Sequence, residues 1–269
     1  MPARPPQRIV CLTEETTETL YLLGEEARIV GISGYTVRPP RARREKPRVS
    51  AFLSAKTDRI LALEPDLVLG FSDLQADIAR ELAKAGLNVV LFNQRSVQEI
   101  LDMIGLLAAM VGAPEKGRAL VAQLEANLDA IRNEAKTNPF RPRVYFEEWD
   151  EPMISGIRWV SELVEIAGGE DIFAELSLSQ AATGRMIHDP SEVVRRAPDV
   201  ILGSWCGKKF RPERVAARPG WGEVPAVRAG ALHEIKSSDI LQPGPAALTD
   251  GVRRIHAILR DCARPSRTR

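Results

Sequence analysis

Short apolar runs alternate with amphipathic stretches along the first half of the chain. Apolar runs bounded by turn residues predict buried strands at 7–12, 28–32, 67–70 and 88–92. Between them, apolar residues recur at three- and four-residue spacing, which predicts helices at 13–23, 57–63, 73–85 and 96–111. The stretch 37–47 is rich in Pro and Arg and predicts an exposed loop. Strands that alternate with helices are typical of a parallel sheet with helices on its faces.

The longest periodic stretch is Pro114–Lys136, which predicts a single helix. Pro114 suits the first turn of a helix, and Pro139 and Pro142 prevent continuation beyond the end. Its apolar positions fall on one helical face, namely Leu120, Val121, Leu124, Leu128 and Ile131. Such a helix spans roughly 35 Å, about the width of a small domain.

After this helix the pattern starts again, with strands predicted at 143–147, 200–203 and 232–235 and helices at 159–167, 190–196, 211–216 and 248–259. Two stretches match, "LALEPDLVLGFS" from Leu61 and "VRRAPDVILGSW" from Val194, with their Pro-Asp pairs 133 positions apart. The opening strands, "RIVCL" from Arg8 and "RVYFE" from Arg143, stand 135 positions apart. The repeat predicts an α/β protein with two parallel-sheet lobes, residues 1–113 and 139–269, bridged by a backbone helix at 114–138.

The net charge, apolar runs and cysteine content of the chain limit the classes of function that it can have. The net charge is +1, which gives no sign of a nucleic-acid partner, and no apolar run approaches the roughly 20 residues of a membrane span. The first residues, MPARPPQRIV, lack the apolar segment of an export signal, so we expect a cytoplasmic protein or a mature form without its signal. Cys11, Cys206 and Cys262 form no disulfide framework or zinc spacing, and each is expected to be a free, mostly buried thiol.

Motifs for catalysis are weak. Nucleotide-binding fingerprints and a G-x-S-x-G elbow are absent, and the three histidines have no partner at metal spacing. The pairs Glu14-Glu15 and Glu147-Glu148 have the chemistry of an acid and a base, although adjacent acids at strand ends are more often caps and solvated charges. We therefore interpret the chain as a binding protein rather than an enzyme.

Aromatic residues follow the repeated strands. Phe71 comes directly after Gly70, and Trp205 comes two residues after Gly203. Ligands of open parallel sheets bind beyond the carboxyl ends of the strands, where these residues stand. Core packing is the common role of a single aromatic, but several at strand ends favour a ligand-binding surface.

Six segments, in this order along nearly the whole chain, resemble class III substrate-binding proteins of ABC importers, which carry cobalamin, ferric siderophores and haem. The segments are "RIVCLTEETTETLYLLG" from Arg8, "LSAKTDRILALEPDLVLG" from Leu53, "WVSELVEIAGGEDIF" from Trp159, "DPSEVVRRAPDVIL" from Asp189, "RPGWGEVPAVRAGALHEI" from Arg218 and "LQPGPAALTDGVRRI" from Leu241. The similarity is greatest to the cobalamin-binding branch.

The resemblance implies a monomeric periplasmic receptor that holds a metal chelate in the cleft between its lobes and delivers it to a dimeric permease. It implies no intrinsic cofactor or resident metal; the expected ligand is cobalamin or a related corrinoid. The expected ligand-binding residues are Tyr35, Phe52, Phe71, Ser72, Trp149, Trp205 and Asp239. Receptors of this family use one acid on each lobe to meet the permease, which here implies Asp77 and Glu192.

Two positions depart from the cobalamin-binding pattern. A basic residue expected four positions after Asp239 is Pro243, and an aromatic expected before the helix at Pro190 is Arg185. A ferric siderophore or a haem therefore remains an alternative ligand. A cytoplasmic protein that handles or senses a corrinoid, or an enzyme on the same scaffold, remains an alternative function.

Overall fold

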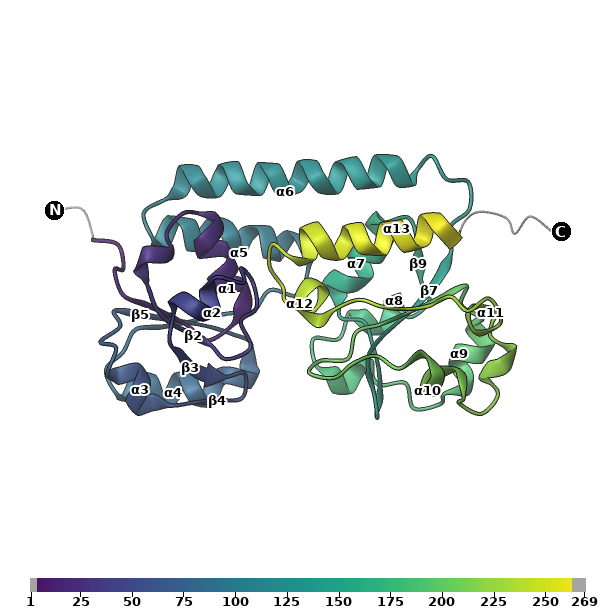
Figure 1. The fold of residues 1–269 in the computed structure, drawn as a ribbon, viewed down its shortest axis with the longest axis horizontal. Coiled ribbons are helices and arrows are strands. Elements are labelled where there is room, and N and C mark those ends of the chain that lie inside the picture. Colours follow the sequence, from purple (N-terminus) through teal and green to yellow (C-terminus); the bar gives the residue numbers. More distant parts are fainter. Residues whose placement is uncertain (1–3, 263–269) are drawn as a thin grey trace. The chain divides into compact units, whose positions relative to one another are not determined.

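The computed structural model describes residues 4–262. The chain divides into two compact units, one containing residues up to Gln94 together with Gln98–Leu124, the other containing Arg95–Val97 and the residues from Glu125 onwards. Each unit is an α/β sandwich built on its own parallel-rich sheet (Figure 1). The predicted fold class is confirmed.

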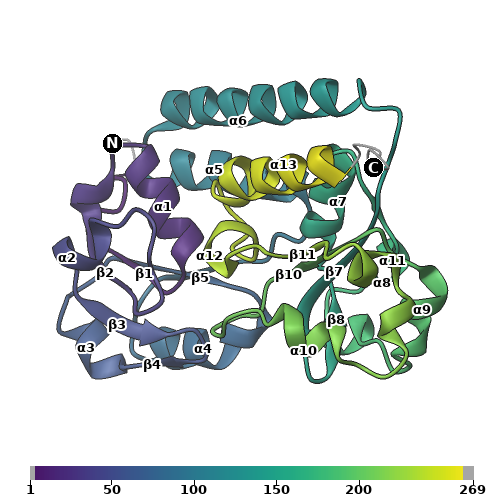
Figure 2. The ribbon, with the colours of Figure 1, turned by 45° about the vertical axis from the view of Figure 1, so that its right-hand side comes forward.

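The first unit holds a six-stranded sheet in the order β4-β3-β2-β1-β5-β6, in which only β3 and β4 pair antiparallel. Its strands are β1 (Ile9–Cys11), β2 (Ile29–Ser33), β3 (Arg48–Ala51), β4 (Ser54–Ala55), β5 (Leu67–Phe71) and β6 (Val89–Phe92). Its helices are α1 (Glu14–Leu22), α2 (Ala42–Glu45), α3 (Thr57–Leu61), α4 (Ala76–Lys84) and α5 (Val97–Met110), which begins in the short stretch assigned to the second unit. Helices α3 and α4 lie on one side of the sheet and α5 on the other (Figure 2).

Two features of this unit differ from the sequence-based expectation. The stretch 37–47 contains the short helix α2, whose Ala42 is buried, rather than only exposed loop. The strands β3 and β4 were not predicted, because only Val49 among their residues is buried and no alternation marks them. They extend the sheet beyond β2 and bring the loop after β3 to its carboxyl edge.

The second unit holds a sheet in the order β11-β10-β7-β8, with β9 also paired to β7. Its strands are β7 (Arg143–Asp150), β8 (Met153–Ser155), β9 (Glu170–Asp171), β10 (Val200–Gly203) and β11 (Leu232–Glu234). Its helices are α7 (Arg158–Ile166), α8 (Ala174–Ser177), α9 (Ser191–Arg196), α10 (Pro212–Ala216), α11 (Pro225–Arg228), α12 (Ser237–Ile240) and α13 (Val252–Cys262). The predicted helix 248–259 begins as a π-helical turn, Ala247–Gly251, and continues as α13.

The repeated Pro-Asp pair performs the same task in both units. The carboxylate of Asp66 accepts hydrogen bonds from the backbone N–H groups of Gln7 (2.7 Å) and Arg8 (2.9 Å), and the carboxylate of Asp199 accepts one from the N–H of Arg143 (2.8 Å). Each aspartate therefore fastens the start of the neighbouring strand, β1 or β7, and sets its register against the following strand. The repeat in the sequence therefore corresponds to a repeated structural feature, the fixed start of a neighbouring strand.

The long helix α6 (Pro114–Ala135) confirms the predicted helix and contributes residues to both units. Leu124, Leu128 and Ile131 of its predicted apolar face are buried. A side chain at Gly117 would collide with Ala108 of α5, so the glycine allows close approach of these two helices. No helix among residues 4–262 has both the length and the apolar character needed to cross a membrane.

Candidate functional site

Parallel strands bring their carboxyl ends to one edge of the sheet in each unit. In the first unit this edge carries the residues at and just after the ends of β1, β2, β3, β5 and β6, and in the second unit those at and just after the ends of β7, β10 and β11. We call these two groups of residues the strand-end surfaces. Ligands of open parallel sheets bind at such edges.

Gln75 organises the strand-end surface of the first unit. Its side-chain oxygen accepts a hydrogen bond from the N–H of Phe71 (3.0 Å), and its side-chain nitrogen donates one to the carbonyl of Phe52 (2.8 Å). A side chain at Gly70 would lie 2.6 Å from the Gln75 oxygen, which explains the glycine there. The predicted residues Phe52, Phe71 and Ser72 are thus brought together, by a glutamine that the sequence analysis did not single out.

Large apolar side chains are exposed around this cluster. Tyr35, Leu53 and Leu74 are 59%, 69% and 60% exposed, and each lies in the turn or short 3-10 helix that follows a strand of the first sheet. Phe71 itself is only 8% exposed. Tyr35 was predicted as a ligand contact, whereas the two leucines were missed because an isolated leucine in a loop carries no sequence signal. Tyr35, Leu53 and Leu74 together form an exposed apolar surface, which we call the apolar rim of the first unit.

Two buried acids stand at the start of α1 on the same edge. Glu14 and Glu15 are 6% and 1% exposed. Burial is the main cause that raises the pKa of Glu14 to about 8, with the neighbouring charge of Glu15 adding to it. Burial likewise raises the pKa of Glu15 to about 7, although a hydrogen bond from Thr13 acts in the opposite direction. Near neutral pH these carboxyl groups are therefore substantially protonated and able to donate hydrogen bonds.

Lys208 lies against two tryptophans on the strand-end surface of the second unit. Its ammonium nitrogen is 4.1 Å from the ring centroid of Trp149 and 5.1 Å from that of Trp205, and it forms an ion pair with Asp150. The indole N–H of Trp149 donates to the carbonyl of Glu151 (2.9 Å). The two predicted tryptophans are therefore brought together, with a lysine that the sequence analysis missed.

Trp205 is held deeper than Trp149. It is 3% exposed, packs edge-on against Phe210 at a centroid distance of 5.0 Å and donates its indole N–H to Glu147 (3.0 Å). The buried Glu147 also accepts hydrogen bonds from Arg218 and from the hydroxyl of Tyr145 (3.0 Å). This arrangement fixes the indole and leaves Trp149 as the more accessible aromatic.

Arg185 occupies the position where the resemblance implied an aromatic. Its guanidinium is buried, forms two hydrogen bonds with Glu148 (2.6 and 3.1 Å) and donates to the carbonyl of Ser155 (2.5 Å). Glu147 and Glu148 thus bind different arginines. Asp239, the remaining predicted residue, is half-buried in α12 and accepts a hydrogen bond from Ser238 (3.1 Å).

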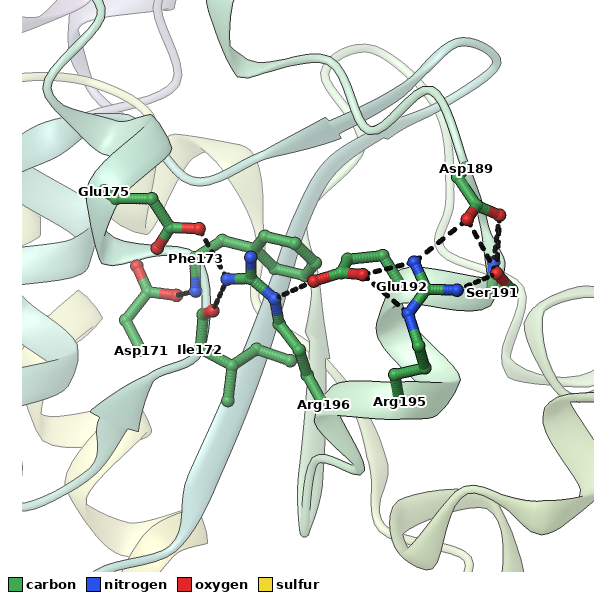
Figure 3. Close-up of polar contacts among 9 residues, drawn as sticks. All are labelled: Asp171, Ile172, Phe173, Glu175, Asp189, Ser191, Glu192, Arg195 and Arg196. Carbon is green, nitrogen blue, oxygen red and sulfur yellow. Dashed lines mark hydrogen bonds and ion pairs between the residues drawn. The ribbon is translucent and has the colours of Figure 1, made fainter.

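The two predicted docking acids differ in their surroundings. The side chain of Asp77 on α4 is 87% exposed and lies 3.2 Å from Arg80. Glu192 on α9 is 30% exposed and binds both Arg195 and Arg196, as Figure 3 shows.

Arg196 ties this network to the body of the second unit. Its guanidinium lies 4.2 Å above the ring of Phe173 and also pairs with Glu175 (2.5 Å), as drawn in Figure 3. Glu192 is therefore both an acid at the surface and a structural member of α9.

The cysteine expectation is correct in one respect and wrong in another. None of the three is disulfide-bonded, but Cys206 is exposed in the loop after β10, Cys262 is half-buried and only Cys11 is fully buried. Within residues 4–262, no group of three histidines, cysteines or acids has the geometry of a metal site.

Comparisons with known proteins agree with this architecture. A family model described as "periplasmic binding protein" matches residues 9–238. The vitamin B12-binding protein of Vibrio parahaemolyticus is 25% identical over 97% of this chain and 90% of its own length. The crystal structure of the periplasmic vitamin B12-binding protein of Vibrio cholerae matches 98% of this chain and 100% of its own, at 24% identity and a TM-score of 0.77. The periplasmic haem-binding protein of Roseiflexus sp. RS-1 matches 96% of this chain and 99% of its own, at 24% identity and a TM-score of 0.78.

Proposed function

Because this chain belongs to the periplasmic binding protein family, we propose that it captures a metal chelate, in the first instance cobalamin or a related corrinoid, for an ABC importer. It acts by binding and release, without turnover of the ligand. The relatives named as vitamin B12-binding proteins support the choice of ligand. The proposal also includes a periplasmic location and a permease dimer as the partner.

The apolar rim of the first unit is the observation that carries this proposal. Tyr35, Leu53 and Leu74 each leave more than half of a large apolar side chain exposed at the strand-end surface. A corrinoid or a tetrapyrrole is broad, flat and partly apolar, so it gains most from such side chains with a few polar groups to orient it. The proposed contacts of the first unit are Tyr35, Phe52, Phe71 and Ser72.

The second unit contributes Trp149, Trp205 and Asp239 to the proposed binding residues. Trp149 is the strongest of these, because its side chain is only partly buried and its indole N–H is oriented by the carbonyl of Glu151. Trp205 supports the surface from below, since Phe210 and Glu147 hold it in a buried position.

A haem or another anionic chelate is the second candidate ligand. The loop after β10 carries Lys208, Lys209 and Arg211, and all three are exposed. Carboxylates of a bound chelate would find cations there, next to the ring of Trp149. A solved relative that binds haem shares the fold.

A titration followed by absorbance tests the proposal. The purified chain is titrated with cobalamin, cobinamide, haem and a ferric siderophore, and we expect saturable binding of a corrinoid at micromolar concentration or below. Trp149→Ala should weaken binding by about thirtyfold, because truncation of a contact aromatic typically costs about 2 kcal/mol. Trp149→Phe is the matched control and should retain most of the affinity.

The outcomes of the titration distinguish the candidate ligands and test the binding role. Preference for haem, with affinity lost in Lys208→Met, would replace the corrinoid by an anionic chelate. Absence of binding to all four ligands, or equal affinity of Trp149→Ala and the unmodified chain, would contradict the proposed site. Chemical conversion of a bound corrinoid would contradict a pure binding role.

A further inference from the structure

A pocket of about 280 Å³ lies within the second unit, at the carboxyl ends of α6 and α7. Its walls come from the end of α6, the loop that follows it, the end of α7 and the face of α13 that carries His256, Leu259 and Arg260. An apolar cavity of about 150 Å³ is large enough for benzene, so this pocket has room for a small organic molecule. None of the proposed chelate-binding residues lines it.

His256 places an unused acceptor in this pocket. The residue is only 9% exposed, and its Nδ1 lies 3.0 Å from the carbonyl oxygen of Ala167. Because a carbonyl only accepts, Nδ1 carries the proton, and Nε2 of the neutral ring is left with a lone pair. Nε2 is buried and makes no hydrogen bond with any residue in the described part of the chain.

A carboxylate faces this nitrogen. Oε1 of Glu134, at the end of α6, lies 3.4 Å from Nε2 of His256. Two acceptors at this distance require a donor, either a proton on Nε2 or an N–H group from a bound molecule. The guanidinium of Arg260 lies 3.3 Å from the same oxygen and is the cation beside Glu134.

The helix ends favour a positively charged ligand in this pocket. The carboxyl ends of α6 and α7 carry the negative end of the helix dipole, which favours a cation. The side chains of Glu134 and Arg260 are both 54% exposed, so either can move aside at the mouth of the pocket. The acceptor on His256 is buried and does not have this freedom.

We propose that this pocket binds a small organic ammonium ion whose N–H groups bridge Nε2 of His256 and the carboxylate of Glu134. The compact apolar body of the ligand would lie against Ala135, Pro139, Pro142 and Leu259, which line the same pocket. The bound ammonium takes the place of Arg260 beside Glu134. This site shares no lining residue with the proposed chelate-binding residues.

Three probes of one shape and different charge test the proposal, namely benzylammonium, benzyl alcohol and benzoate. Binding is followed by the NMR signals of the His256 ring at about pH 8. We expect benzylammonium to give a saturable shift at millimolar concentration, and the other two probes to bind at least tenfold more weakly.

Substitutions of two exposed residues test which charge the ligand requires. Glu134→Gln should weaken benzylammonium binding by about tenfold, because it removes the charge of the bridging acceptor. Arg260→Gln should leave the affinity unchanged or increase it, since it removes the competing cation. Equal binding of all three probes, tighter binding of benzoate that is lost in Arg260→Gln, or no saturable shift with benzylammonium would each overturn the proposal.

Discussion

At the scale of residues, the aromatic side chains of the second unit show how burial divides similar residues into different roles. Trp149 lies near the carboxyl end of β7, Trp205 follows β10, and both lie beside Lys208. Trp205 is held below the surface because its indole N–H is bound to the buried Glu147, whereas the indole N–H of Trp149 donates to the carbonyl of Glu151 in a turn. The accessible ring is therefore the better target for testing ligand contact.

The buried acids of α1 lead to a prediction on pH dependence. The pKa of Glu14 rises from 4.5 to about 8 in the folded protein, so the native state holds a proton that the unfolded chain releases. The free energy of unfolding should therefore fall as the pH rises from about 4.5 to about 8. Glu14→Gln should remove much of this fall and stabilise the protein at the upper end by on the order of 2 kcal/mol.

Chemical denaturation at a series of pH values measures this effect. Glu81→Gln, on the exposed surface of α4, is the control and should keep the pH profile of the unmodified protein. A Glu14→Gln profile that runs parallel to the unmodified one would show that the carboxyl group is not held protonated by burial.

At the scale of elements, the repeated aspartates connect the sequence repeat to strand register. Asp66 uses both carboxylate oxygens on the N–H groups that precede β1, whereas Asp199 uses one oxygen at β7. The amide of an asparagine keeps only one acceptor oxygen. The two sites therefore differ in how they should tolerate the same substitution.

We predict that Asp66→Asn destabilises the protein by about 1–2 kcal/mol, because one backbone N–H loses its acceptor. Asp199→Asn should cost about 0.5 kcal/mol or less, since the remaining oxygen still accepts from Arg143. Denaturant titration of both variants provides the comparison. Equal losses would mean that the charge of the aspartate, rather than the number of accepted hydrogen bonds, supports the strand.

At the scale of the whole molecule, the proposed function assigns delivery to a transporter to one acid in each unit. Asp77 is exposed on α4, and Glu192 belongs to the network of Arg195 and Arg196 on α9 (Figure 3). Substitution of Glu192 therefore also removes two ion pairs, and its effect on folding must be measured with its effect on transport.

We predict that Asp77→Lys combined with Glu192→Lys abolishes ligand uptake through the cognate importer and leaves the ligand affinity of the purified protein unchanged. The reason is that reversed charges repel the basic residues expected on the permease. Glu81→Lys, on the same helix as Asp77, is the control and should support normal uptake. Uptake by the doubly reversed variant, or a loss of ligand affinity in it, would contradict a docking role.

The order of the elements and their repetition could be predicted from the sequence, because both rest on local signals. The period of apolar residues marks α6 and most strands, and the Pro-Asp pairs mark two strand starts that prove equivalent in structure. The position of β3 was missed because a short strand with one buried residue has no periodic pattern.

Tertiary structure alone decided which of the candidate side chains are accessible. Burial of Trp205 depends on Phe210 and on Glu147 of another strand, and neither relation follows from the local sequence. The pocket beside His256 likewise combines segments that are far apart in the chain, the ends of α6 and α7 with α13. Local periodicity determines elements, whereas a binding surface arises from contacts between distant segments, so only the folded chain shows where it lies.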